Sequence, residues 1–120
     1  MTSQTREQLC AKPCTDCKNS GQPVSPDVVR VQLELLPGWE AADDGRRIYK
    51  NWKTKNFSSA MEFLNRVAQL AEKEGHHPDL HLTGYCHVSI VLSTHSIGGL
   101  SENDFILAAK IDGLPVPLTS

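Results

Sequence analysis

The feature that most constrains the fold is a long amphipathic stretch between residues 58 and 75. We expect Ser58 or Ser59 to cap a helix there and Gly75 to end it. Such a helix needs a second layer to cover its apolar stripe, and the stripe is broad enough to cover a sheet. The apolar residues at helical spacing are Ala60, Phe63, Leu64, Val67, Ala68 and Ala71.

Two further helices and four strands are expected around it. Between residues 87 and 94, Val88, Ile90 and Leu92 share one face of an expected strand, and His87, Ser89, Val91 and Ser93 share the other. Ser101 and Asp104 have the spacing of a capping box that opens the last helix. The expected helices are 26–36, 58–75 and 102–111, and the expected strands are 39–42, 46–54, 80–85 and 88–94. We therefore predict an α+β fold of order α-β-β-α-β-β-α, an antiparallel four-stranded sheet with three helices packed on one face.

Length and charge limit the organisation and the partners. The 120 residues suit one domain, which we place at residues 23–120, after a flexible cysteine-containing N-terminal tail at 1–22. A formal net charge of -2 gives no general attraction to nucleic acid or to an anionic membrane. No apolar run approaches the roughly 18 residues of a membrane span, and the first residues do not resemble a signal peptide. We expect a cytoplasmic protein.

Three histidines point to proton chemistry. His76 and His77 are adjacent, and His95 ends the alternating strand. Imidazole can give and take protons near neutral pH because its ordinary pKa is about 6.5. Gly75 and Pro78 favour a turn that would let the pair converge on one site. Two alternatives are exposed loop histidines and a zinc site that recruits Asp79, His81 and His87.

The surrounding residues resemble the signature of a known family. The downstream set is Glu72-Lys73-Glu74-Gly75-His76-His77-Pro78-Asp79, Tyr85, Val88-Ser89-Ile90-Val91-Leu92-Ser93-Thr94-His95, Gly98-Gly99-Leu100-Ser101 and Asp104. The upstream set is Pro37-Gly38-Trp39, Ile48-Tyr49-Lys50-Asn51-Trp52 and Phe57 with Ala60, Phe63 and Val67. In this order and spacing, across residues 25–112, the chain resembles the pterin-4a-carbinolamine dehydratases.

The resemblance implies an enzyme that dehydrates 4a-hydroxytetrahydropterin, a carbinolamine, to quinonoid dihydropterin during tetrahydrobiopterin recycling. It implies that His76, His77 and His95 are catalytic, with no cofactor and no metal. It also implies substrate-binding roles for Glu72, Trp39, Pro78 and Thr94. The alternatives are a solvated helix residue for Glu72 and core packing for Trp39. Asp104 matches the last acid of the signature, and we interpret it as a capping residue.

The same resemblance suggests partners. It implies a pterin substrate and a homo-oligomer, a tetramer or a dimer, without nucleic acid or membrane. We expect Ala60, Met61, Leu64 and Ala68 to offer a face of the long helix to the partner subunit. The alternative function is that of a dimerisation cofactor or transcriptional coactivator, an interaction protein, because some animal family members have that role.

Other features leave questions open. Gly75, Leu80 and Thr54 depart from residues common in the family, which affects substrate preference more than reaction type. A cluster of Cys10, Cys14 and Cys17 offers three possible metal ligands. A basic run interleaved with aromatics could bind nucleic acid, although we favour a solvated face. Its residues are Arg46, Arg47, Lys50, Lys53 and Lys55, with Tyr49 and Trp52.

Overall fold

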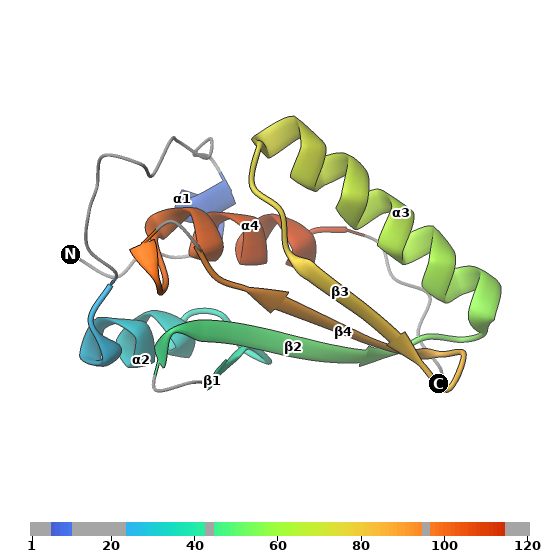
Figure 1. Ribbon diagram of the computed structural model, residues 1–120, viewed down its shortest axis with the longest axis horizontal. Coiled ribbons are helices and arrows are strands. Elements are labelled where there is room, and N and C mark those ends of the chain that lie inside the picture. The colour runs from blue at the N-terminus through green and yellow to red at the C-terminus, as the bar shows by residue number, and fades with distance from the viewer. Residues whose placement is uncertain (1–5, 11–23, 43–44, 95–96, 115–120) are drawn as a thin grey trace.

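The predicted α+β architecture is confirmed in a computed structural model, which describes residues 6–10, 24–42, 45–94 and 97–114 (Figure 1). From α2 onward, the elements follow the predicted order α-β-β-α-β-β-α. A small N-terminal helix, α1, precedes them, so the described residues form four helices and not three. The elements are α1 (Arg6–Cys10), α2 (Pro26–Glu34), β1 (Glu40–Ala42), β2 (Arg47–Lys53), α3 (Phe57–Glu74), β3 (Asp79–Thr83), β4 (His87–Leu92) and α4 (Glu102–Asp112).

The four strands form one antiparallel sheet in the order β1-β2-β4-β3. Along β4, Val88, Ile90 and Leu92 are buried, Ser89 and Val91 between them are half-buried, and His87 before them is exposed. The sheet therefore has a covered face and an open face, as the alternating pattern predicts. Strand β2 also has one buried and one exposed face. Ile48, which pairs with Leu92, is buried, and its neighbour Arg47 is exposed.

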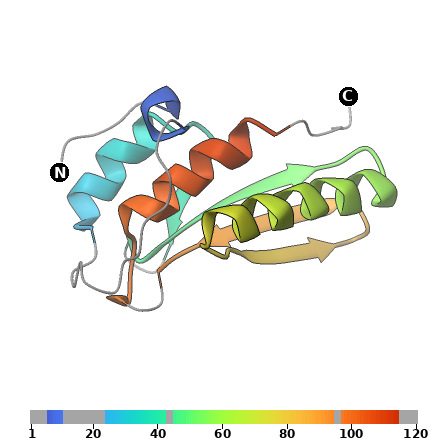
Figure 2. The same cartoon turned by 90° about the horizontal axis from the view of Figure 1, so that it is seen from above.

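Helix α3 lies alongside β3 in both ribbon views (Figures 1 and 2). Its N-cap is Asn56 and not Ser58 or Ser59, because Asn56 Oδ1 accepts the Ser59 backbone N–H at 2.7 Å. Gly75 ends the helix in the left-handed region, with φ 69°. Ala60, Phe63, Val67 and Ala71 are buried and Leu64 is half-buried, so most of the predicted stripe covers the sheet. Ala68, which was also predicted to belong to the stripe, is exposed.

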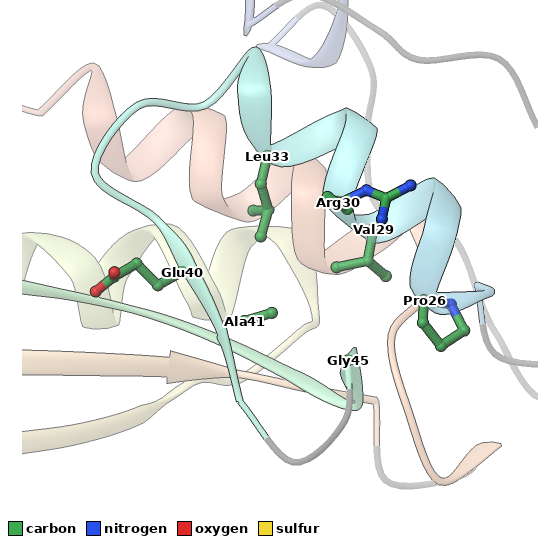
Figure 3. A pocket seen from close by; sticks show the side chains of 7 residues that line it. All are labelled: Pro26, Val29, Arg30, Leu33, Glu40, Ala41 and Gly45. Atoms are coloured by element: carbon green, nitrogen blue, oxygen red, sulfur yellow. The ribbon is translucent and has the colours of Figure 1, made fainter.

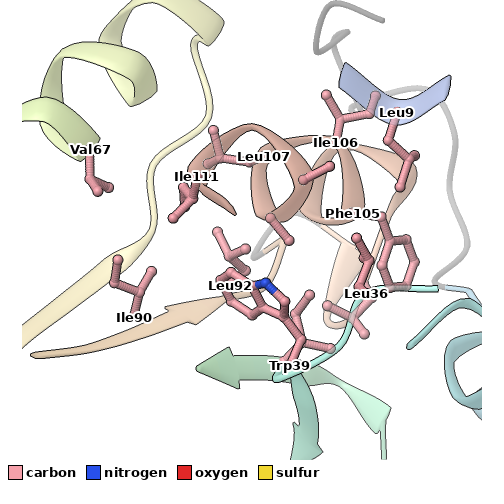
Figure 4. Close-up of a cluster of buried hydrophobic side chains, with 14 of the residues drawn as sticks. Leu9, Leu36, Trp39, Val67, Ile90, Leu92, Phe105, Ile106, Leu107 and Ile111 are labelled. Atoms are coloured by element: carbon pink, nitrogen blue, oxygen red, sulfur yellow. The ribbon is translucent and has the colours of Figure 1, made fainter. Parts of the chain in front are cut away.

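One hydrophobic core joins the covered face of the sheet to the helices. Val29 of α2, Val67 of α3 and Leu107 of α4 belong to the same cluster of buried side chains as Ile90 and Leu92 (Figure 4). Helix α4 is almost wholly enclosed, with eight of its eleven residues buried. This burial gives the side chains at the start of α4 a rigid base.

The segment assigned to a loose tail is partly ordered by the core. Leu9 of α1 is 0 % exposed and lies beside Phe105 and Ile106 of α4 (Figure 4). Within residues 6–10, one apolar side chain is thus buried on α4, and the division into a tail at 1–22 and a domain at 23–120 stays a prediction. The rest of that segment lies outside the described residues.

The basic run does not form one platform. Arg47, Tyr49 and Lys53 belong to the open face of the sheet, and Trp52 packs in the core. Lys50 Nζ lies 2.8 Å from Asp112 Oδ1, and the Asp112 side chain is only 3 % exposed. One of the five basic residues is thus used to hold α4 on β2. Among the described residues, no helix is long and apolar enough to cross a membrane.

Candidate functional site

The loop that follows α3 is fixed to α4 at two points. Lys110 Nζ lies 2.8 Å from Glu74 Oε2, at the last residue of α3. After Gly75, His76 reaches the first turn of α4. The positive φ of Gly75 makes this turn possible, and a Cβ there would meet nothing within 4 Å. Backbone conformation and not space therefore favours glycine at this position.

His76 and Asp104 form a close pair. Their Nε2 and Oδ1 atoms are 2.6 Å apart, and the side chains are 12 % and 0 % exposed. A buried carboxylate needs hydrogen-bond partners, and an imidazole held by a carboxylate is fixed in orientation. This pair unites two signature positions that are 28 residues apart.

The second oxygen of Asp104 is also occupied. Its Oδ2 atom accepts the Thr94 hydroxyl at 2.7 Å and the Ser101 backbone N–H at 2.9 Å. The hydroxyl oxygens of Thr94 and Ser101 are 2.8 Å apart. Ser101 and Asp104 form the predicted capping box. Asp104 therefore has the predicted capping role. It also contacts His76, and this contact was not predicted from the sequence.

His77 points to a different partner. Its Nε2 atom lies 3.5 Å from Glu72 Oε1, and both side chains are exposed. Pro78, the next residue, is half-buried. The adjacent histidines thus take different surroundings, one enclosed and one open to solvent. His95 lies outside the described residues, and Thr94 before it is 6 % exposed and bridged to Gly99.

Trp39 belongs to a separate cluster. It is 3 % exposed, donates its indole N–H to Asp112 Oδ2 at 3.1 Å and packs edge-on against Trp52. Asp112 follows Asp104 by eight residues, which is about 12 Å along a helix. The structure therefore brings Thr94 and His76 together through Asp104, and it does not bring Trp39 to the same point.

Within the described part of the chain, no three His, Cys, Asp or Glu side chains are grouped as metal ligands. Cys14 and Cys17, and the side chain of Cys10, lie outside it, as does His95. A cavity of about 490 Å³ opens between α2 and β1 (Figure 3). It includes neither His76 nor His77; its lining residues are Pro26, Val29, Arg30, Leu33, Glu40, Ala41 and Gly45. A hydrogen bond to Glu40 raises the pKa of Tyr49, and the charge of that carboxylate adds to the effect.

The geometry around His76 suits proton transfer. A histidine oriented by a buried carboxylate is the arrangement that general acid/base catalysis uses. Sequence reasoning found His76 and did not find its contact with Asp104. The match of Asp104 to the last acid of the family signature could have indicated this contact. No local periodicity connects the two positions.

The chain matches the family model described as pterin 4 alpha carbinolamine dehydratase over residues 22–114. It is 43 % identical over 111 residues to the Arabidopsis thaliana protein named pterin-4-alpha-carbinolamine dehydratase 2, mitochondrial. That match covers 90 % of this chain and 59 % of the longer plant protein. A Halorhodospira halophila protein named for the same dehydratase is 43 % identical over 106 residues, covering 88 % of this chain and 96 % of the relative.

Two solved structures are similar in fold. One is described as a transcriptional coactivator/pterin dehydratase from Brucella melitensis, with a TM-score of 0.70, 33 % identity and coverage of 77 % of this chain and 97 % of that one. The other is a pterin dehydratase-like protein described as a RuBisCO assembly factor in the alpha-carboxysome. Its TM-score is 0.54 at 23 % identity, over 63 % of this chain and 87 % of that one, so it supports the fold alone.

Proposed function

The chain belongs to the pterin-4-alpha-carbinolamine dehydratase family, and we propose that it is a hydro-lyase that removes water from a 4a-hydroxytetrahydropterin. The observation that carries the proposal is the 2.6 Å contact between His76 and buried Asp104. His76 is one of the three histidines that the family resemblance implies are catalytic, and Asp104 matches the last acid of the same signature.

The reaction needs an acid and a base. Hydroxide is a poor leaving group, so the oxygen on C4a takes up a proton as the C–O bond breaks and leaves as water. A base removes a proton from the pterin ring system, and quinonoid dihydropterin results. Substrate and product are related by loss of water, so the step needs no redox cofactor. In this scheme His76 and His95 transfer the protons.

We assign His77 to substrate binding. Its exposure and its distance of 3.5 Å from Glu72 support a role at the open side of the site, where it can meet a ligand. Glu72 and Pro78 flank it and would contact the pterin from the same side. Trp39 and Thr94 are nearly enclosed, which favours supporting roles for them over extensive contact with substrate. The metabolic setting in this proposal is cytoplasmic tetrahydrobiopterin recycling.

A homo-oligomer, a tetramer or a dimer, is part of the proposal. The sheet leaves β1 and β3 as edges, and such edges are usually covered. On α3, Phe57 and Met61 are 54 % and 40 % exposed. Leu64 and Ala68 continue the same face at helical spacing. Ala60, which we expected on this surface, is fully buried in the core.

The second candidate is a coactivator-type interaction protein. The description of the Brucella melitensis relative as a transcriptional coactivator favours it. The exposed α3 face, from Phe57 to Ala68, would serve this function, whereas the dehydratase would use the histidines. The two functions use different residues and can be separated by mutation.

The direct test is stopped-flow dehydration of freshly generated 4a-hydroxytetrahydropterin, corrected for the spontaneous reaction. We expect the protein to accelerate loss of the carbinolamine in proportion to its concentration, with and without a chelator, because the scheme has no Lewis acid. No acceleration at micromolar protein would exclude the dehydratase assignment and leave the interaction function as the alternative.

A further inference from the structure

The hydrogen bonds around Asp104 have a definite direction. A carboxylate at neutral pH only accepts hydrogen bonds, and each hydroxyl has one hydrogen to give. Thr94 donates its hydrogen to Asp104 Oδ2, so at the 2.8 Å contact the Ser101 hydroxyl must donate to Thr94. The side chains therefore form an ordered relay from Ser101 through Thr94 to Asp104.

The carboxylate that the relay holds determines the tautomer of His76. With Oδ2 taken by Thr94 and by the Ser101 backbone N–H, Oδ1 is the oxygen that faces the imidazole. Because this oxygen accepts, Nε2 of His76 must carry the hydrogen. A neutral imidazole has one N–H, and its other nitrogen is then a free acceptor.

Building on the proposed dehydratase, we infer that Thr94 and Ser101 are positioning residues that make Nδ1 of His76 the atom exchanging a proton with substrate. Thr94 is 6 % exposed and gives its only hydrogen to Asp104, so it does not donate to the pterin. Thr94 acts indirectly, because it donates a hydrogen bond to the Asp104 carboxylate, which in turn orients the His76 imidazole.

The tautomer can be measured without any activity assay. In protein labelled with ¹⁵N-histidine, long-range ¹H–¹⁵N correlation spectra distinguish the two neutral tautomers. His76 is one of five histidines, and its signals are identified by their loss in His76→Gln. In the neutral form of the ring, recorded once the two nitrogen shifts no longer change with rising pH, we expect hydrogen on Nε2 and none on Nδ1. Hydrogen on Nδ1 in the wild-type protein overturns the inference.

The role of Thr94 is tested with a pair of substitutions. Thr94→Val keeps the shape and removes the hydroxyl, and Thr94→Ser keeps the hydroxyl. We expect Thr94→Val to mix the tautomers and to lower kcat about tenfold to a hundredfold with little change in KM, the range known for loss of an outer hydrogen-bond partner of a metal-bound histidine. Thr94→Ser should restore the single tautomer and most of the rate. The control is Thr83→Val, at an exposed position on β3.

The proposed dehydratase function and the positioning role of Thr94 can fail independently. If the wild-type protein lacks dehydratase activity but shows the Nε2–H tautomer that Thr94→Val disturbs, the relay stands and the proposed function fails. If Thr94→Val keeps both the pure tautomer and the wild-type rate, the relay has no positioning role. Should Thr94→Val not fold, Ser101→Ala, which keeps the backbone N–H to Asp104, must lower kcat by a smaller factor; an unchanged rate then contradicts the inference.

Discussion

Nε2 of His76 and Oδ1 of Asp104 are 2.6 Å apart, which ties the loop after α3 to the first turn of α4. Two family positions that are distant in sequence thus become one unit. Because Asp104 also closes the capping box of α4, the same carboxylate stabilises the helix and orients the imidazole.

Replacing Asp104 with asparagine should damage catalysis far more than folding. The amide oxygen can still accept the Ser101 N–H, so the helix cap survives. Its uncharged amide no longer fixes the imidazole as a carboxylate does, and we expect the dehydration rate to fall by about 10² to 10⁴. Rates and urea denaturation of Asp104→Asn should be compared with Asn103→Ala, at the neighbouring buried position. A rate within threefold of wild type would be incompatible with the orienting role.

Leu9 should contribute measurably to stability. Its side chain is fully buried, so Leu9→Ala should cost about 2 to 4 kcal/mol. Val31→Ala, at a residue that is 42 % exposed, should change stability by no more than about 0.5 kcal/mol. Denaturant midpoints measure both. Equal midpoints for Leu9→Ala and wild type would mean that α1 does not stabilise the folded protein.

Asp112 should be sensitive to loss of its charge partner. It is 3 % exposed and receives hydrogen bonds from Lys50 and Trp39. Lys50→Met should cost about 2 to 4 kcal/mol, somewhat below the range for fully enclosed pairs because Lys50 is 22 % exposed. The double variant Lys50→Met/Asp112→Asn removes both charges, keeps an acceptor for the Trp39 indole N–H and should recover part of this loss. Additive losses in thermal denaturation would show that the two residues are not coupled.

Met61 should control assembly. We expect wild-type protein to be a dimer or tetramer by light scattering at micromolar concentration. Met61→Lys places a charge on the exposed apolar face of α3 and should give a monomer with an unchanged circular dichroism spectrum. Gln69→Lys, on another side of the same helix, is the matched control and should assemble like wild type. A monomeric wild-type protein would refute the proposed oligomer.

Local patterns were sufficient to predict most of the fold. The alternation of Val88, Ile90 and Leu92 predicted which side of β4 is buried, and the stripe of α3 predicted its contact with the sheet. The start of α3 was misplaced because serine and asparagine are both good caps, and only tertiary structure shows that Asn56 is used. Leu9 was missed because one apolar residue in a five-residue helix has no detectable period.

Only part of the site was predicted, because residue types are visible in the sequence and contacts between distant segments are not. His76 and His77 were found from their own residue types, but their different surroundings depend on a turn at Gly75 and on contacts with distant elements. The contact with Asp104 spans 28 residues and joins the loop after α3 to α4, so no local signal contains it. The separation of Trp39 from His76 likewise depends on which end of α4 each one reaches.

The central claim is that His76 transfers a proton during dehydration, and the rate of His76→Ala tests it most directly. In stopped-flow dehydration of 4a-hydroxytetrahydropterin, we predict a rate about 10² to 10⁴ below wild type, the usual contribution of a general acid or base. His81→Ala, at an exposed position on β3, is the matched control and should retain the wild-type rate. A His76→Ala protein that is folded and fully active would contradict the account.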